Sequence, residues 1–294
     1  MMFSIWRRRK NCILNYMEKT RGNAIARLKY NIHNTERRTI FVIGAGASSE
    51  VASLPLGKEL AGMLLEQWQC GGSDTFKATL DGIAIKYGFD KNDVKTILFA
   101  LSIIDKERLV NEVCRYLSVP DKIHSSFYSQ VSRSFLEKKI DVILNFNFDT
   151  LLDDALAEYC PEINYSKIIS DEEAAASEFG IDDRLYIKPH GSVDCKRSLR
   201  FQRADFYDMG RNMSGLIARL VGEHPVDIVT VGFRAKFYEF TDILKEKMHM
   251  ESEIFIVDKV EDVLDNNLLS FYHDGFIQID ECYVLTDFMK QLNL

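Results

Sequence analysis

Side chains that can orient a hydroxyl or move a proton occur directly after apolar runs of the chain. Asn147 and Asp149 follow the run at residues 140–144, and His190 follows the next such run. Amide and carboxylate groups hold hydroxyls or water in place, and histidine is a general base near neutral pH. Asp258 ends a later run, where an acidic side chain can accept hydrogen bonds from ribose hydroxyls. We predict a functional site at these strand ends, with His190 as a general base; the alternative for Asn147 and Asp149 is a helix N-cap with no other role.

A glycine turn precedes all of these residues. The apolar run at residues 39–43 ends in Gly44-Ala45-Gly46, and two glycines with a small residue between them let the backbone approach a ligand closely. If a helix begins there, its N–H groups and the positive end of its dipole suit a phosphate. The motif is not the usual dinucleotide fingerprint, because Ser49 replaces the third glycine. We predict a nucleotide-binding turn, with a tight turn that holds no ligand as the alternative.

Alternating strands and helices would position these groups. Short apolar runs predict strands at residues 39–43, 140–144, 185–187, 226–232, 254–258 and 276–279. Helical spacing of apolar residues predicts helices that include residues 57–69, 150–152, 214–220 and 237–247. This alternation predicts an α/β fold with a doubly wound, mostly parallel, Rossmann-like sheet. Ligands of such sheets bind beyond the carboxyl ends of the strands, where the polar residues stand.

Two helical segments lie outside this alternation. Residues from about 70 to 138 contain long apolar stripes and exceed a plain crossover between parallel strands, so we interpret them as a helical insertion that packs over the nucleotide site. Residues 1–38 are interpreted as an N-terminal helical extension of the main domain, residues 39–294. The buried stripe of that extension is predicted at Ile25, Leu28 and Ile32.

The composition is that of an ordinary globular protein, with 46% hydrophobic and 28% charged residues among 294. The net charge of −7 disfavours direct nucleic-acid binding, and no apolar run approaches the roughly 20 residues of a membrane span. Six cysteines without a C-x-x-C pair favour reduced thiols in the cytoplasm over disulfides or a zinc site. The apolar stretch that begins at Cys12 is too short for an export signal, and Met17 could be the true start.

The order of the motifs resembles that of the sirtuins. The motifs are Gly44-Ala45-Gly46-Ala47-Ser48, Asn147-Phe148-Asp149, Lys188-Pro189-His190-Gly191-Ser192 and Val231-Gly232-Phe233. The chain looks most like the bacterial sirtuin-like NAD-hydrolysing effectors of anti-phage defence, over about residues 39–285. The resemblance implies a sirtuin-like sheet and NAD as the bound molecule.

The resemblance also implies roles for single residues. The catalytic residues would be Asn147, Asp149 and His190. Asn147 would orient the ribose or the attacking water, His190 would take a proton, and Asp149 would tune the site. The cofactor-binding residues would be Gly44, Ala45, Gly46, Ser48, Gly191, Gly232 and Asp258. Of these, the glycine turn would cradle the pyrophosphate, and Gly232 and Asp258 would lie towards the adenosine.

Departures from the deacylating sirtuins bear on the reaction. Between Gly191 and Val226, where deacylases carry a zinc ribbon with two cysteine pairs, this sequence has one cysteine, Cys195. Residues 54–58 lack the Asp-Phe-Arg of the deacylases, and Phe233 stands where serine or threonine is common. Without a platform for an acylated peptide, we expect water as the acceptor, no metal, and hydrolysis of NAD to nicotinamide and ADP-ribose.

An unrestrained NAD hydrolase would harm its own cell, so the resemblance implies an effector that waits for a trigger. We expect activation by a partner, such as a helicase-like ATPase of a defence system, or by homo-oligomer assembly. Two other hypotheses stay open. One is an NAD-dependent protein deacylase or ADP-ribosyltransferase, and the other is a non-catalytic nucleotide-sensing module in which Asn147 and His190 are structural.

Overall fold

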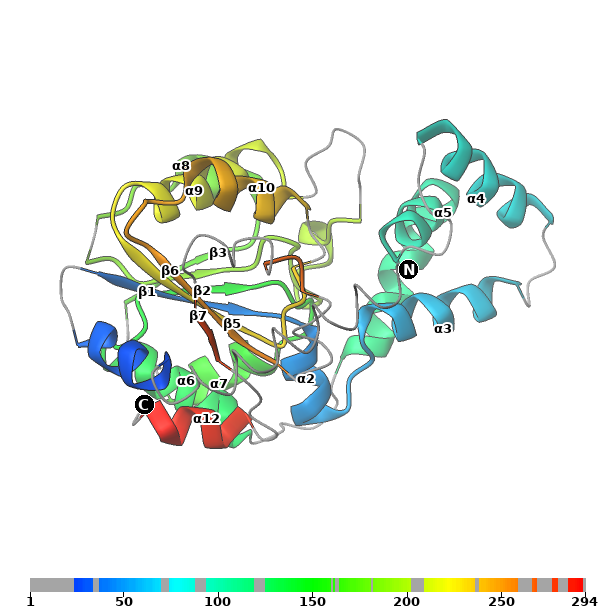
Figure 1. Ribbon diagram of the computed structural model, residues 1–294. Coiled ribbons are helices and arrows are strands. Elements are labelled where there is room, and N and C mark those ends of the chain that lie inside the picture. Colours follow the sequence, from blue (N-terminus) through cyan, green and yellow to red (C-terminus); the bar gives the residue numbers. More distant parts are fainter. Residues whose placement is uncertain are drawn as a thin grey trace, which may run out of the picture.

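One parallel sheet organises the chain. The computed structural model describes residues 24–33, 37–69, 74–87, 94–118, 125–159, 161, 164–180, 182–201, 209–235, 238–258, 266–268, 277–279 and 285–292. Within these residues the sheet has seven strands in the order β3-β4-β2-β1-β5-β6-β7, and all neighbours are parallel (Figure 1). The strands are β1 (Arg38–Ile43), β2 (Val142–Asn145), β3 (Ser166–Ile168), β4 (Leu185–Ile187), β5 (Val226–Val231), β6 (Glu253–Val257) and β7 (Ile277–Ile279). The predicted α/β fold is confirmed.

Helices cover both faces of the sheet, which is why its central strands are buried throughout and mostly apolar. Along β1, Ile40 and Val42 enter one hydrophobic cluster, whereas Phe41 and Ile43 enter the other, as the pleat requires. The first face is covered by α8 (Asp171–Ala176), α9 (Arg211–Gly222) and α10 (Tyr238–Lys247) (Figure 1). The second face is covered by a helix at residues 24–32 and by α6 (Ser126–Leu136), α7 (Leu151–Tyr159) and α12 (Leu285–Leu292).

The helix at residues 24–32 carries the stripe that the sequence predicted. Leu28 is fully buried in the cluster of the second face, and Ile25 and Ile32 pack against it half-buried. Asn31 also donates to Asp227 at the amino end of β5, at 3.1 Å. The rest of the proposed extension, residues 1–23 and 34–36, lies outside the described residues.

A group of helices extends to one side of the sheet (Figure 1). It contains α3 (Gly57–Gln69), α4 (Asp74–Tyr87) and α5 (Val94–Leu117), which share a third hydrophobic cluster. The chain breaks inside α5 at Asp105, with φ −158° and ψ 92°, and the Asp105 carboxylate then caps the next turn by accepting from the Arg108 N–H at 2.9 Å. As a domain division, the insertion at about 70–138 stays a prediction; α6, within that range, packs on α7 and α12.

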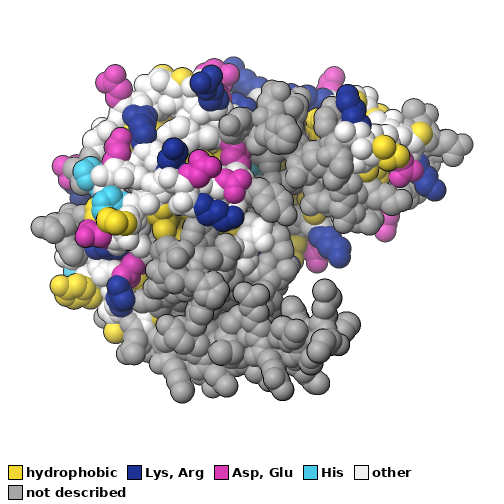
Figure 2. Space-filling view, turned by 45° about the horizontal axis from the view of Figure 1, so that its top comes forward, with side chains coloured by type: hydrophobic (Ala, Val, Ile, Leu, Met, Phe, Trp, Pro, Cys, Tyr) yellow, Lys and Arg dark blue, Asp and Glu magenta, His cyan; other side chains and the backbone are white. Residues whose placement is uncertain are grey.

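Three described elements had not been predicted: β3, α8 and the short 3₁₀ helix η1 (Lys196–Ser198). Strand β3 has three residues at the edge of the sheet, and Ser166 and Lys167 are exposed, so it shows no apolar run. Helix α8 did have a signal: Ser170 and Glu173 form a capping box, which the S-x-x-E spacing encodes. Acidic and basic side chains are interspersed on the described part of the face in Figure 2. None of the described helices combines the length and the apolar character that crossing a bilayer requires.

Candidate active site

Several strand ends meet at one edge of the sheet. Ile43, the last residue of β1, is in register with Asn145 of β2 and with Val231 of β5. Strand β4 ends beside β2, and β6 ends beside β5. The segments that follow these strands therefore lie along one edge, where the ligands of parallel sheets bind.

The glycine turn packs against the loop that follows β5. A Cβ atom on Gly44 would lie 2.4 Å from the Gly232 carbonyl oxygen, and one on Gly46 would lie 2.9 Å from the Gly232 Cα. Gly232 itself has a φ of +57°, and a Cβ there would meet the Ala47 nitrogen at 2.4 Å. Contact between the two loops therefore requires all three glycines, a reason that was not apparent from the sequence.

The first turn of α2 (Ala45–Ala52) is partly used by this contact. The Gly46 N–H donates to the Gly232 carbonyl oxygen at 3.0 Å, and the Ala47 N–H donates to the Gly44 carbonyl oxygen at 3.0 Å. A phosphate at this helix end would have to share these donors. Ala45 and Gly46 are half-buried and stand at the turn. Their binding of the pyrophosphate stays a prediction.

Asn147 is tied to the glycine turn by both of its amide hydrogens. Its Nδ2 donates to the Gly44 carbonyl oxygen at 3.0 Å and to Ser48 Oγ at 2.9 Å. A carbonyl oxygen can only accept, so the amide nitrogen must face Gly44 and the orientation of the side chain is determined. Asn147 is 5% exposed. Its Oδ1 is the group that remains for a ligand, so Asn147 can orient a hydroxyl or a water by accepting from it.

Asp149 belongs to the same segment after β2 as Asn147 and lies next to the start of α7. One oxygen accepts from the Leu151 N–H at 3.1 Å, across Thr150, as in an Asx-turn that leads into the helix. Burial raises the pKa of the Asp149 carboxyl, against the opposing effects of the Lys188 ammonium, the Ser48 hydroxyl and the Leu151 N–H. Asp149 therefore supports the start of α7 without being its N-cap, and its other oxygen remains a carboxylate oxygen of the candidate site.

His190 lies among aromatic rings. Its ring is edge-on to Phe146, with centroids 5.3 Å apart, and is 6.1 Å from Phe148. Phe146 and Phe148 flank Asn147 in the sequence, so this packing brings the imidazole to the loop that carries Asn147. The histidine is 5% exposed. Gly191 follows with a φ of +83°, and a Cβ there would meet the Ser198 carbonyl oxygen at 2.2 Å, so this glycine shapes the turn after His190.

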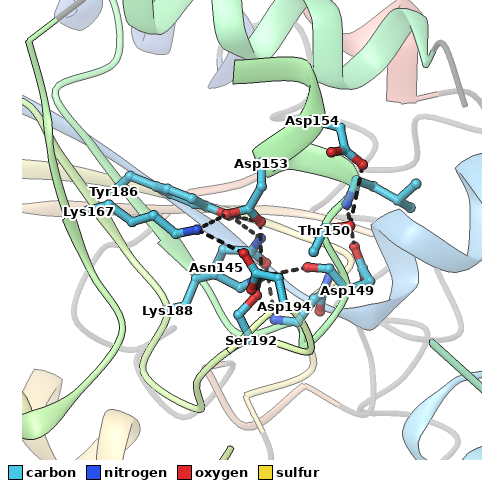
Figure 3. Close-up of polar contacts among 12 residues, drawn as sticks. Asn145, Asp149, Thr150, Asp153, Asp154, Lys167, Tyr186, Lys188, Ser192 and Asp194 are labelled. Atoms are coloured by element: carbon cyan, nitrogen blue, oxygen red, sulfur yellow. Dashed lines mark hydrogen bonds and ion pairs between the residues drawn. The ribbon is translucent and has the colours of Figure 1, made fainter. Parts of the chain in front are cut away.

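A buried lysine connects the segment that follows β2 to the segment that follows β4 (Figure 3). Lys188 is fully buried, and its ammonium contacts the Asp149 carbonyl oxygen at 2.6 Å, Ser192 Oγ at 2.7 Å and the Asp153 carboxylate at 3.0 Å. Asp153 also accepts from the Tyr186 hydroxyl at 2.8 Å. The ammonium thus fixes the segment after β2 relative to the segment after β4, which carries His190.

The sequence contained a partial signal for this network. Lys188 stood within the His190 motif, but no role had been given to it. Asp153 follows Asp149 by four residues, so the sequence could have placed both carboxylates near the start of the helix predicted at residue 150.

Asp258 is not part of the group around Asn147. It directly follows β6 and is half-buried, and β5 separates β6 from β1 in the sheet. The structure therefore puts Asp258 on the other side of Gly232 from Asn147 and His190. A ligand that touched both ends would extend along the edge of the sheet, past the glycine turn.

An open groove in the described residues lies elsewhere, on the helical group, and its lining includes Arg108, Asn111 and Arg115. Its charges are compensated within the protein, because Arg108 pairs with Glu112 at 2.9 Å and stacks over the Trp68 ring. We therefore place the candidate site at the strand ends. Within the described ranges, no three His, Cys, Asp or Glu side chains are grouped to hold a metal ion.

Comparison with known proteins gives one family match. Residues 141–273 match the SIR2-like domain. One similar solved structure comes from work on the mechanism and regulation of Sir2 enzymes; the alignment covers 92% of this chain and 95% of that chain, with 11% identity and a TM-score of 0.42. No curated protein matches. The matched residues are a little less than half of the chain, and they contain Asn147, Asp149, His190 and Gly232.

Proposed function

We propose that this protein hydrolyses NAD to nicotinamide and ADP-ribose. The observation that carries the proposal is the grouping of Asn147, Asp149 and His190 at one edge of a parallel sheet, within the part of the chain that matches the SIR2-like domain. An amide acceptor can hold a water molecule, an imidazole can take its proton, and a carboxylate can stabilise positive charge, so together these groups can support attack of water on a ribosyl carbon.

The reaction would break the bond between the nicotinamide nitrogen and the ribose anomeric carbon. Positive charge then develops on the ribose, and a fixed, water-poor polar site lowers the barrier to it. Asn147 Oδ1 would accept a hydrogen from the attacking water or a ribose hydroxyl and so orient it. The water oxygen bonds to the anomeric carbon, His190 takes the proton, and nicotinamide leaves with the electron pair of the broken bond. The negative charge of the Asp149 carboxylate would stabilise the positive charge that develops on the ribose.

Regulation is part of the proposal. Asn147, Asp149 and His190 are each at most 5% exposed, so a ligand that reached them would have to move neighbouring side chains. This burial supports a site that is closed in the isolated chain and opens when a partner protein or a second copy of the chain binds. An anti-phage effector with such restraint would spare its host until infection.

The test is NAD cleavage by the wild-type chain and by His190→Ala, each alone and with candidate partners. We expect His190→Ala to lose a factor of about 10² to 10⁴ in rate, the usual contribution of a general base, without loss of the folded state. The matched control is His224→Ala, an exposed histidine before β5, which should retain full activity. A folded His190→Ala protein with the wild-type rate would refute the assigned role.

The same reactions also separate the other hypotheses. Release of free ADP-ribose in the same amount as nicotinamide indicates hydrolysis. ADP-ribose found attached to protein indicates a transferase, and nicotinamide release only when an acylated peptide is present indicates a deacylase. NAD binding without any nicotinamide release, under every condition, would favour the nucleotide-sensing module.

A further inference from the structure

A tyrosine of helix α6 contacts the candidate site next to the glycine turn. Tyr128 lies near the start of α6 and is 1% exposed. Its hydroxyl oxygen is 2.8 Å from Ser48 Oγ, which also accepts from the Asn147 amide at 2.9 Å. Ser48 is therefore the shared partner of the tyrosine and of a candidate catalytic residue.

The hydroxyl of Ser48 is shared between two partners. Asn147 donates one amide hydrogen to Ser48, so the serine oxygen has one acceptor position and one hydrogen left. The bond to Tyr128 uses one of these, and either hydroxyl can be its donor. A tyrosine hydroxyl keeps its hydrogen here, because burial raises the pKa of Tyr128 well above its ordinary value.

We propose that Tyr128 is a positioning residue, whose hydroxyl holds Ser48 so that the Asn147 amide keeps the orientation that the reaction needs; its effect on catalysis rests on the proposed function. Ser48 takes one amide hydrogen of Asn147 and the Gly44 carbonyl oxygen takes the other. The amide nitrogen therefore faces the glycine turn, and Asn147 Oδ1 is turned away from Ser48.

Other charged groups face the same place, and none of them replaces the tyrosine. Lys188, which follows β4, and Asp153 of α7 act on Asp149 by charge, and the Leu151 N–H occupies one of its oxygens. None of these groups is bonded to Ser48 or to the Asn147 amide. Without the tyrosine hydroxyl, Ser48 could rotate, and Asn147 would lose a fixed neighbour.

The test is Tyr128→Phe, which keeps the ring and removes only the hydroxyl. The matched control is Tyr116→Phe, because the Tyr116 hydroxyl also bonds a side chain, Gln67 at 2.7 Å, but within the helical group. We expect Tyr128→Phe to lower the kcat for NAD cleavage about tenfold, the scale of one lost hydrogen bond, with KM within about twofold. The control should change neither constant.

A second readout does not depend on activity. In protein with labelled asparagine, the Asn147 side-chain amide signal, assigned by its loss in Asn147→Asp, should shift and exchange faster with solvent in Tyr128→Phe but not in Tyr116→Phe. If Tyr128→Phe does not fold, Ser48→Ala breaks the same link from its other end and should move the same signal.

Either of two results would overturn the positioning role: an unmoved Asn147 signal, or an unchanged kcat in a variant whose signal moves. A wild-type chain that releases no nicotinamide would instead refute the proposed function. The amide signal would then still show whether Tyr128 holds Asn147, and an unmoved signal would still overturn that claim.

Discussion

Gly232→Ala is the sharpest test of how the edge of the sheet is built. Gly232 has a φ of +57°, which costs an L-residue about 1–2 kcal/mol. Its new Cβ would lie 2.4 Å from the Ala47 nitrogen and 2.7 Å from the Gly46 carbonyl carbon. Both are backbone atoms at the start of α2, so they cannot rotate away as the end of a side chain could.

These two costs set the expected magnitude. Forcing extra atoms into a packed site costs about 1–3 kcal/mol, so the sum with the left-handed backbone is about 2–5 kcal/mol of unfolding free energy. Domains are typically stable by about 5–15 kcal/mol, so the variant should remain folded at low denaturant, with a clearly lower midpoint. The loops after β1 and β5 should separate slightly, because the clash lies between them.

The assay is denaturant unfolding, with Gly215→Ala in α9 as the matched control. A Cβ on Gly215 meets nothing within 4 Å, so this change should stabilise the chain by up to about 1 kcal/mol through helix propensity. A Gly232→Ala protein as stable as the wild type would refute the packing argument. NAD affinity of the folded variant gives a further result: a loss of binding would support a ligand at the turn, and wild-type affinity would mean that the glycines serve packing alone.

Two further changes test the buried charges. Lys188→Met removes the ammonium that Asp153 and Ser192 contact and should lower the free energy of unfolding by about 3–5 kcal/mol. Lys245→Met on the surface should change it by no more than about 0.5 kcal/mol. Equal denaturation midpoints for the two variants would contradict this prediction. Asp149→Asn tests the raised pKa of that carboxyl. Because the folded chain holds the proton to a higher pH than the ordinary 3.8, the stability contributed by Asp149 falls as pH rises above that value. The excess stability of wild type over Asp149→Asn should therefore fall from pH 4 to pH 7, and a rise in unfolding experiments over that range would contradict the assignment.

The fold was predictable because its signals are local and continuous. The run at residues 39–43 is buried on both faces, so its apolar character shows without knowledge of its neighbours. Helix α3 begins and ends at the residues that helical spacing predicted, Gly57 and Gln69. Edge strand β3 could not be found in this way, because two of its three residues are exposed and its place depends on pairing with β4.

The candidate site was predictable only in part. Strand ends and polar residues showed where Asn147 and His190 would lie, since the carboxyl ends of parallel strands share one edge. The partners of these residues come from distant segments, and no local pattern marks them. Tyr128 reads as one more apolar position of an amphipathic helix, and nothing in the sequence pairs its hydroxyl with Ser48, 80 residues away.

These cross-loop contacts decide how mutations at this edge should be interpreted. Asn147 is bonded to the turn after β1, Lys188 to the segment after β2, and Gly232 packs on the start of α2. A change in any one loop therefore displaces the others, and lost NAD cleavage alone cannot identify a catalytic residue. The free energy of unfolding of each variant separates a catalytic residue from a residue that only packs the loops together. Gly232 and Lys188 variants should lose activity in proportion to lost packing. His190→Ala, whose ring contacts include the phenylalanines beside Asn147, should instead lose the proposed chemical step while most of the fold remains.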